Sequence, residues 1–412
     1  MAGPGYELIG AEEAAEVMEV LNSGFLSRYG PADNPAFLAK VHHLEQEIAA
    51  LQGAKYALAL SGGGSAAIWV ALVALGVGSG DEVIVPGFTY VASISSIVFT
   101  GATPILAEVD DTFDLDPADV EAKITPRTKA IVVVHMLGGP ARMDELKAVA
   151  DRHGIPILED SAQAFGATYK GRGIGTIGTI GTYSFNEHKT ITAGDGGMVI
   201  TDDENLYERA FAIHDQGHAP SRLEAKYAPR PFLGLNFRMT ELTGAVLLAQ
   251  LRKMDYIVSR LRANKAIVKD MLMEVPDIGY RTLTDPDGDL ATHLVVTLPT
   301  AEIASKVAAE VGSITLNQSG WHVYSKMDHV LQRRTPTGKG CPFNCTCTTH
   351  PRPEYFAGML PQTDALLARS ISIGIGIKDG NLAPFGLTLR DGEAEARACG
   401  RTFRDVVIRN LR

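Results

Sequence analysis

The chain has 412 residues, of which 45% are hydrophobic and 21% are charged, and 42 are glycine. This composition is typical of a globular protein, and the length predicts two domains. The net charge is −10 and the sequence has no basic run, which argues against nucleic acid or an anionic membrane as a partner.

The first residues, MAGPGYELIG, have neither the basic nor the apolar segment of a signal peptide. No apolar run reaches the roughly 18 residues that a membrane span needs. Four cysteines are too few for a disulfide scaffold in a chain of this length. We therefore expect a cytoplasmic protein.

In chain order, residues 11–22 predict a first helix, followed by a loop rich in Gly and Pro. From residue 55, short apolar runs alternate with helical patterns. The predicted strands occupy residues 55–60, 82–86, 103–109, 129–135, 155–160, 182–185 and 197–202, and the predicted helices residues 65–76, 117–124 and 144–154. Buried β-branched runs separated by helices predict an α/β fold with a mostly parallel seven-stranded sheet between helices.

A long helical pattern over residues 240–275 follows the predicted sheet. After it, a short strand pattern at 291–299 precedes a helical pattern at 300–312, which indicates a smaller α+β unit. We expect a large ligand-binding domain over residues 1–255, including the first helix and its loop. A small C-terminal domain would occupy residues 256–412.

A glycine-rich turn leads from the first predicted strand into a helix and places Gly64, Ser65 and Ala66 near the helix N-terminus. Free N–H groups and the positive end of the helix dipole make such a position suitable for a phosphate group. The alternative is an ordinary turn in which Ser65 caps the helix.

Four further polar or aromatic residues lie at or near the ends of predicted strands, and Lys189 lies between a strand end and a second glycine-rich turn. A desolvated lysine can form a Schiff base, and Asp160 could hold the protonated pyridine nitrogen of pyridoxal phosphate (PLP). Gln163 could bind the ring hydroxyl, Tyr90 could stack on the ring and Ser184 could bind the phosphate. Taken singly, each has an ordinary alternative: a surface lysine, a helix cap or a core tyrosine. Their order along the chain favours a PLP site.

These residues lie in segments that resemble the DegT/DnrJ group of sugar aminotransferases, which are PLP enzymes of fold type I. The matching segments are residues 63–93, 101–110, 157–185, 188–201 (HKTITAGDGGMVIT) and 236–251 (NFRMTELTGAVLLAQL). The resemblance covers residues 10–255, and the C-terminal third matches only loosely.

The resemblance implies that Lys189 carries PLP as an internal aldimine and moves the proton, with Asp160 as the second catalytic residue. It places Gln163 near the ring hydroxyl, Tyr90 on the ring face, and Gly64, Ser65, Ala66 and Ser184 around the phosphate. Asn236 corresponds to a family asparagine that reaches the phosphate of the other subunit. A homodimer with shared active sites is therefore expected.

The implied reaction moves an amino group from L-glutamate or L-glutamine, through pyridoxamine phosphate, to a keto group of a sugar, nucleotide-sugar or cyclitol. Ser65 stands where the family usually has Thr, and Asp195 where Glu is commoner. A dehydratase branch of the family has histidine at the lysine position; here His188 precedes Lys189, which favours transamination. A PLP-dependent dehydratase or lyase of the same fold, or a non-catalytic regulatory relative, remains the alternative.

Four other features predict no separate function. Residues 173–178 match G-x-G-x-x-G but lack the strand before and the helix after, so we interpret them as a flexible loop near the cofactor. Cys341, Cys345, Cys347 and His350 do not have a usual zinc spacing, and no metal is expected. Trp321 and His322 could line the acceptor pocket, although a structural role is favoured. His135 ends a predicted strand beside the site and could support it.

Overall fold

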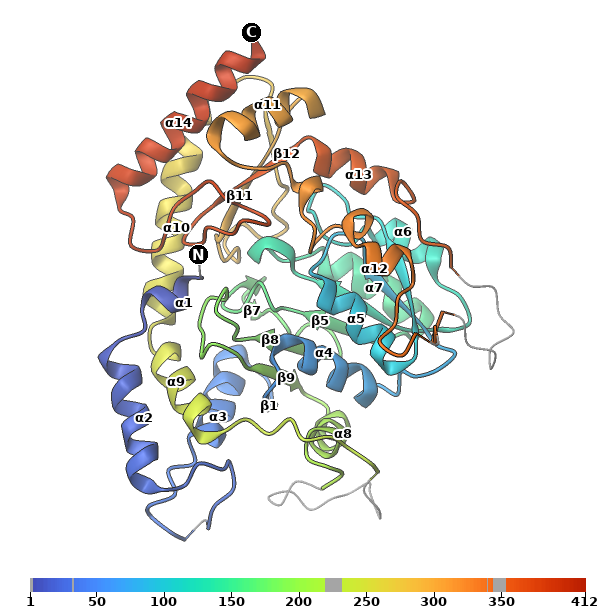
Figure 1. Cartoon of the computed structure of the whole chain (residues 1–412), viewed down its shortest axis with the longest axis vertical. Coiled ribbons are helices and arrows are strands. Elements are labelled where there is room, and N and C mark those ends of the chain that lie inside the picture. Colours follow the sequence, from blue (N-terminus) through green and yellow to red (C-terminus); the bar gives the residue numbers. More distant parts are fainter. Residues whose placement is uncertain (1–2, 32, 219–231, 339, 344–352) are drawn as a thin grey trace.

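The computed structural model describes residues 3–31, 33–218, 232–338, 340–343 and 353–412. A seven-stranded sheet lies at its centre (Figure 1). Its strands, in spatial order, are β1 (Tyr56–Leu60), β9 (Gly197–Thr201), β8 (Ile180–Ser184), β5 (Ile157–Asp160), β4 (Thr128–Val134), β2 (Glu82–Pro86) and β3 (Thr103–Ala107). All seven predicted strands are confirmed. Only β9 runs against the others, because it pairs antiparallel with both β8 and β1.

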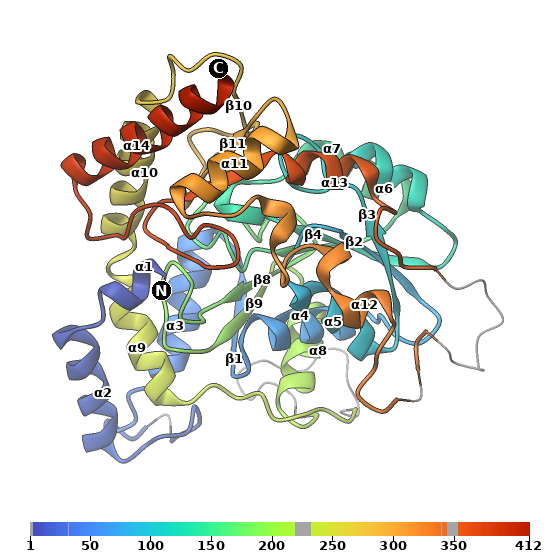
Figure 2. The same ribbon diagram turned by 45° about the horizontal axis from the view of Figure 1, so that its top comes forward.

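Both faces of this sheet are buried, as the near-continuous apolar strands predict. Ile131 and Val133 of β4 pack in one core cluster, while Val132 and Val134 pack in the other. The first cluster includes residues of α3 (Lys40–Gln52), α6 (Pro117–Lys123) and α7 (Met143–His153); the second includes residues of α4 (Gly63–Ala74), α5 (Val91–Thr100) and α8 (Glu204–His214). Figure 2 shows α4, α5 and α8 together on one side of the strands. The sheet is therefore the middle layer of three.

A second, antiparallel sheet lies toward the C-terminus and consists of β10 (Gly279–Tyr280), β11 (His293–Thr297) and β12 (Ser370–Gly374). Helices α10 (Met254–Asp270), α11 (Ala301–Val311) and α14 (Glu393–Leu411) accompany it (Figure 1). The long helical pattern at 240–275 is two helices, α9 (Glu241–Leu251) and α10, separated at residues 252–253. The domain division at residue 255 stays a prediction.

The remaining elements are short or peripheral. They are α1 (Pro4–Glu7), α2 (Ala11–Ser23), α12 (Asp328–Leu331) and α13 (Pro361–Ala368), the strand pair β6 (Thr168–Tyr169) and β7 (Arg172–Gly173), and three 3-10 turns at Met136–Gly138, Leu316–Gln318 and Tyr324–Lys326. Within the described ranges, no helix is both long and apolar enough to cross a membrane.

The loop over residues 173–178 encloses a buried carboxylate. The backbone N–H groups of Gly175, Ile177 and Gly178 donate to the carboxylate of Glu159 at 2.9, 2.6 and 2.5 Å. The glycines fit this role because Gly175 has a φ of 99°, which other residues rarely adopt. None of residues 173–178 lines the cavity at Lys189, and the interpretation of this segment as a flexible loop near the cofactor stays a prediction.

His135 completes the environment of this carboxylate. Its Nδ1 accepts the backbone N–H of Ala141 at 3.1 Å, so the ring proton is on Nε2, which donates to Glu159 at 2.9 Å. Successive side chains of a strand point to opposite faces. Glu159 therefore anchors the strand behind its neighbour Asp160.

We expect Glu159→Gln to lower the free energy of unfolding by about 2–3 kcal/mol, because an amide cannot accept from all four donors. Urea denaturation measures this change. Glu302→Gln, at an exposed position on α11, is the matched control and should have little effect. A Glu159→Gln protein as stable as the control would contradict the assigned role of the carboxylate.

Candidate functional site

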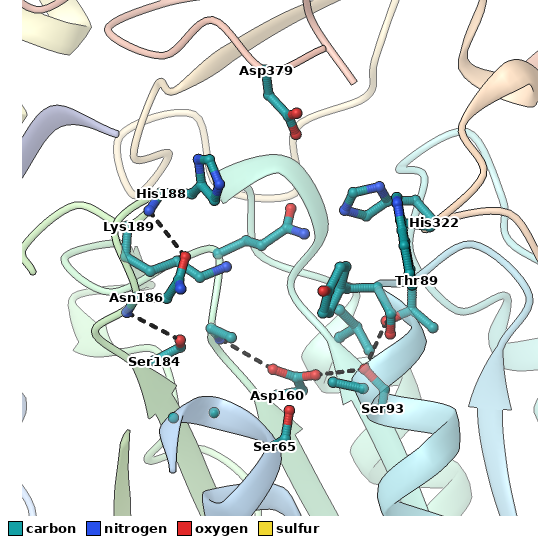
Figure 3. Close-up of a pocket in the computed structure, with 18 of the residues that line it drawn as sticks. Ser65, Thr89, Ser93, Asp160, Ser184, Asn186, His188, Lys189, His322 and Asp379 are labelled. Atoms are coloured by element: carbon teal, nitrogen blue, oxygen red, sulfur yellow. Dashed lines mark hydrogen bonds between the residues drawn. The ribbon is translucent and has the colours of Figure 1, made fainter. Parts of the chain in front are cut away.

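A cavity of about 420 Å³ lies at the carboxyl ends of β1, β5 and β8 (Figure 3). Ligands of open α/β sheets bind at this edge. Its wall includes seven of the nine predicted site residues: Gly64, Ser65, Tyr90, Asp160, Gln163, Ser184 and Lys189. Ala66 and Asn236 are not among the residues that line it.

The N-terminus of α4 forms one side of the cavity. The first helical hydrogen bond of the turn is donated by the backbone N–H of Ala66 to Gly62 O, at 3.4 Å. The three preceding N–H groups therefore lie at the free, positive end of the helix. Gly62 is the N-cap and has a φ of 83°, so the alternative in which Ser65 caps the helix is wrong. Ser65 is the third helical residue and lines the cavity.

Gly64 allows the helix to approach β8 closely. A Cβ atom at this position would lie 2.9 Å from the Cβ of Ser184. The hydroxyl of Ser184 accepts the backbone N–H of Asn186 at 3.4 Å (Figure 3). Two serines and the helix N-terminus thus surround one end of the cavity.

The carboxylate of Asp160 lies at the floor of the cavity and is only 4% exposed. Ser93 donates its hydroxyl to Oδ2 at 2.7 Å, and the N–H of Ala162 donates to Oδ1 at 3.1 Å (Figure 3). The hydroxyls of Thr89 and Ser93 are 2.8 Å apart. No sequence motif indicated either hydroxyl, and no helix was predicted at residues 91–100, where α5 begins at Val91.

The side-chain amide of Gln163 is fixed by the turn after β4. Its Oε1 accepts the N–H of Leu137 at 3.0 Å. The NH2 group remains as a donor, which suits recognition of an oxygen such as a ring hydroxyl.

Tyr90 lies beside two aromatic residues from the C-terminal third. The N–H groups of Thr89 and Val91 donate to the carbonyl oxygens of His322 and Trp321, both at 2.9 Å. The centroid of the Tyr90 ring is 5.3 Å from that of His322 and 6.4 Å from that of Trp321. Both residues line the cavity, so they are more than the structural pair that the sequence favoured.

The side chain of Lys189 extends into the cavity from the loop between β8 and β9 (Figure 3). The N-terminal segment packs on this loop: the N–H groups of Gly3 and Gly5 donate to Glu187 O at 2.8 Å and Lys189 O at 3.4 Å. Burial lowers the pKa of Lys189 below its usual 10.5, although the nearby carboxylates of Asp160 and Asp379 partly oppose this shift. The cavity therefore favours a neutral, nucleophilic amine.

Two buried histidines flank this amine. Burial lowers the pKa of both His293 and His322 to about 3. Both rings are therefore neutral near pH 7 and act as hydrogen-bonding groups. Asp379 and Asn381 line the same side of the cavity. No sequence motif indicated His293, Asp379 or Asn381.

The other candidate residues lie elsewhere. Asn236 is exposed, and its Oδ1 accepts the N–H of Arg238 at 3.2 Å. Cys341 is an exposed free thiol, while Cys345, Cys347 and His350 lie outside the described residues. In the ranges that the structure describes, no group of three His, Cys, Asp or Glu side chains could hold a metal ion.

We expect Lys189→Met to stabilise the PLP-free protein at neutral pH, because the variant need not desolvate an ammonium group. The unfolded chain binds more protons than the folded one wherever the pKa is lowered on folding. The increase in the free energy of unfolding of the variant over the wild type should therefore be largest below the lowered pKa of Lys189. It should shrink as the pH rises toward 10.5. Chemical denaturation of both proteins from pH 7 to 10 measures it. A destabilised variant at pH 7 would contradict the lowered pKa.

Comparison with known proteins shows the family that the sequence motifs led us to expect. The sequence profile of the DegT/DnrJ/EryC1/StrS aminotransferase family matches residues 7–324. The chain is 42% identical over 266 residues to GDP-perosamine synthase of Caulobacter vibrioides, covering 64% of this chain and 67% of that one. It is 37% identical over 319 residues to L-glutamine:2-deoxy-scyllo-inosose aminotransferase of Streptoalloteichus tenebrarius, covering 74% of each.

Solved structures share the fold over the whole chain. A structure of 3-amino-5-hydroxybenzoic acid synthase superposes with a TM-score of 0.79 and 28% identity, covering 99% of this chain and 100% of that one. DesV of S. venezuelae, solved in complex with a ketimine intermediate, superposes with a TM-score of 0.76 and 31% identity, covering 98% of each. The chain belongs to the DegT/DnrJ/EryC1/StrS aminotransferase family.

Proposed function

We propose that this aminotransferase binds PLP on Lys189 and transfers an amino group from L-glutamate or L-glutamine to a keto group of a sugar, nucleotide-sugar or cyclitol. The proposal rests on one observation. Lys189, whose pKa is lowered by burial, lines the same cavity as the buried carboxylate of Asp160.

The donor set of the cavity fits PLP. The free N–H groups of α4, with Ser65 and Ser184, match a phosphate group. Asp160 is held by two hydrogen bonds in a fixed orientation and matches a protonated pyridine nitrogen. Tyr90 provides an aromatic face and Gln163 a donor for the ring hydroxyl.

PLP, when bound, supplies an electron sink that stabilises negative charge on the α-carbon of the amino donor. Asp160 keeps that sink effective by holding the positive charge of the pyridine nitrogen. The amine of Lys189 would take the proton from the α-carbon of the donor and return it on the cofactor side. The neutral form of Lys189, favoured by burial, is the form that can accept this proton.

The acceptor would occupy the side of the cavity opposite the helix N-terminus. Trp321 offers an apolar face there, and His322, Asp379 and Asn381 offer hydrogen-bonding groups suited to hydroxyls. Relatives named for a perosamine nucleotide and for an inosose support this class of acceptor, and the second supports glutamine as the donor.

We also propose a homodimer in which Asn236 contacts the phosphate held by the partner. Asn236 is exposed and lies outside the cavity of its own chain, as such a role requires. Sedimentation of the PLP-bound protein as a monomer would exclude this arrangement.

The cofactor and the first half-reaction can be tested together by visible absorption. The purified protein with PLP should show the band of lysine-bound cofactor, and L-glutamate or L-glutamine should bleach it. The Lys189→Ala variant, incubated with PLP in the same way, should not show the band of lysine-bound cofactor. A band that no amino acid bleaches would exclude transamination, and the absence of any band after PLP addition would exclude the cofactor.

Ser93 is expected to act as a positioning residue for Asp160. Ser93→Ala removes one hydrogen bond to the carboxylate and should slow bleaching by the donor roughly tenfold. Ser93→Ala should also shift the visible absorption band of bound PLP, because the carboxylate of Asp160 would change its position relative to the pyridine ring. Ser95→Ala is the matched control on the same helix, since the hydroxyl of Ser95 bonds only to the carbonyl oxygen of Ala92 in the described chain. Equal rates and spectra for the two variants would contradict the assignment.

A further inference from the structure

A second cavity, of about 350 Å³, lies between α10 and the strands β10 and β11. It is separate from the one at Lys189, although His293 lines both. Its wall is rich in charge: Arg262, Lys265, Lys269 and Arg281 are cationic, and Asp287 and Asp289 are acidic.

Four residues of this wall carry a buried polar atom that has no hydrogen-bond partner among the described residues. The atoms are Tyr280 Oη, Arg281 Nε, Asp289 Oδ1 and His293 Nε2. Arg281, Asp289 and His293 are 8%, 4% and 6% exposed. Buried polar atoms are nearly always hydrogen-bonded, since leaving one unpaired is costly. Half of the eight such atoms in the described chain belong to this one wall, which indicates that a ligand completes it.

The ion pairs in the wall leave an excess of positive charge. Arg281 pairs with Asp114 at 2.7 Å, and Lys265 pairs with Asp289. Among the other charged residues of this wall, Arg262 and Lys269 are positive and only Asp287 is negative. The Nζ of Lys269 lies over the Tyr280 ring, 5.5 Å from its centroid, so this cation and the ring that carries one of the unpaired atoms are neighbours.

We propose that this cavity is a second ligand site, which binds a small oxyanion that carries a hydroxyl group. The anion would accept hydrogen bonds from Arg281 and Tyr280 and balance Lys269. Its hydroxyl would donate to Asp289. A phosphate monoester and a hydroxylated carboxylate share this chemistry.

The residues around this site also hold the turn that orients Gln163. Arg281 Nη1 donates to the carbonyl oxygen of Met136 at 2.6 Å. Thr292, which precedes His293, donates to the carbonyl oxygen of Leu137 at 3.3 Å, and Leu137 donates its N–H to Gln163. A ligand here would therefore contact the support of the catalytic cavity.

Isothermal titration calorimetry of the PLP-bound protein, at constant ionic strength in chloride, tests the site with inorganic phosphate and, separately, gluconate. At least one probe should bind with one site per chain. Tyr280→Phe and Lys269→Gln should each weaken that binding about tenfold or more. The probe that binds distinguishes a phosphate site from a carboxylate site.

Tyr256→Phe, at an exposed position on α10, and Lys306→Gln, on α11, are the matched controls and should leave binding unchanged. Tyr280→Phe removes a hydroxyl without a partner, so its thermal unfolding temperature should not fall below that of the wild type. Absence of binding by both probes would overturn the proposal. Binding that Tyr280→Phe and Lys269→Gln leave unchanged would overturn it too, because the anion would then lie elsewhere, such as at the N-terminus of α4.

Discussion

The burial of one amino group, that of Lys189, is the constraint on which the rest of the site depends. Desolvation lowers the pKa of this lysine, and a rigid surrounding is needed to keep its amino group buried. The rigidity comes from both ends of its loop, because β8 and β9 pair directly and residues 3–5 pack on the loop between them. Residues 185–196 connect these two antiparallel strands, and Lys189 lies in this connection at the edge of the sheet.

Asp160 complements this amine because its strand is fixed on both faces. On the cavity side, Ser93 and Ala162 orient the carboxylate. On the opposite side, Glu159 collects the N–H groups of the 173–178 loop and the ring of His135. Two neighbouring carboxylates thus have different surroundings, the cavity for Asp160 and the buried loop for Glu159, because successive side chains of a strand point to opposite faces.

The sequence predicted all seven strands of the large sheet and the seven residues that meet in its cavity, because strand ends and glycine-rich turns are local signals. It could not predict contacts that depend on the C-terminal third. Trp321 and His322 contact Tyr90 through backbone hydrogen bonds between segments more than 200 residues apart in the sequence. Asp379, which also lines the cavity, lies still farther along the chain. Ser93 was missed for a different reason: it lies in the first turn of α5, a helix that the sequence pattern did not predict. The role of the G-x-G-x-x-G segment could not be predicted, because its backbone binds a buried carboxylate that no local pattern reveals.

The attachment point of the cofactor tests the central claim most directly. The protein loaded with PLP would be reduced with sodium borohydride, digested and mapped by mass spectrometry. The account predicts one pyridoxyl group per chain, on the peptide that contains Lys189. A pyridoxyl group on another lysine, or none after full loading, would contradict it.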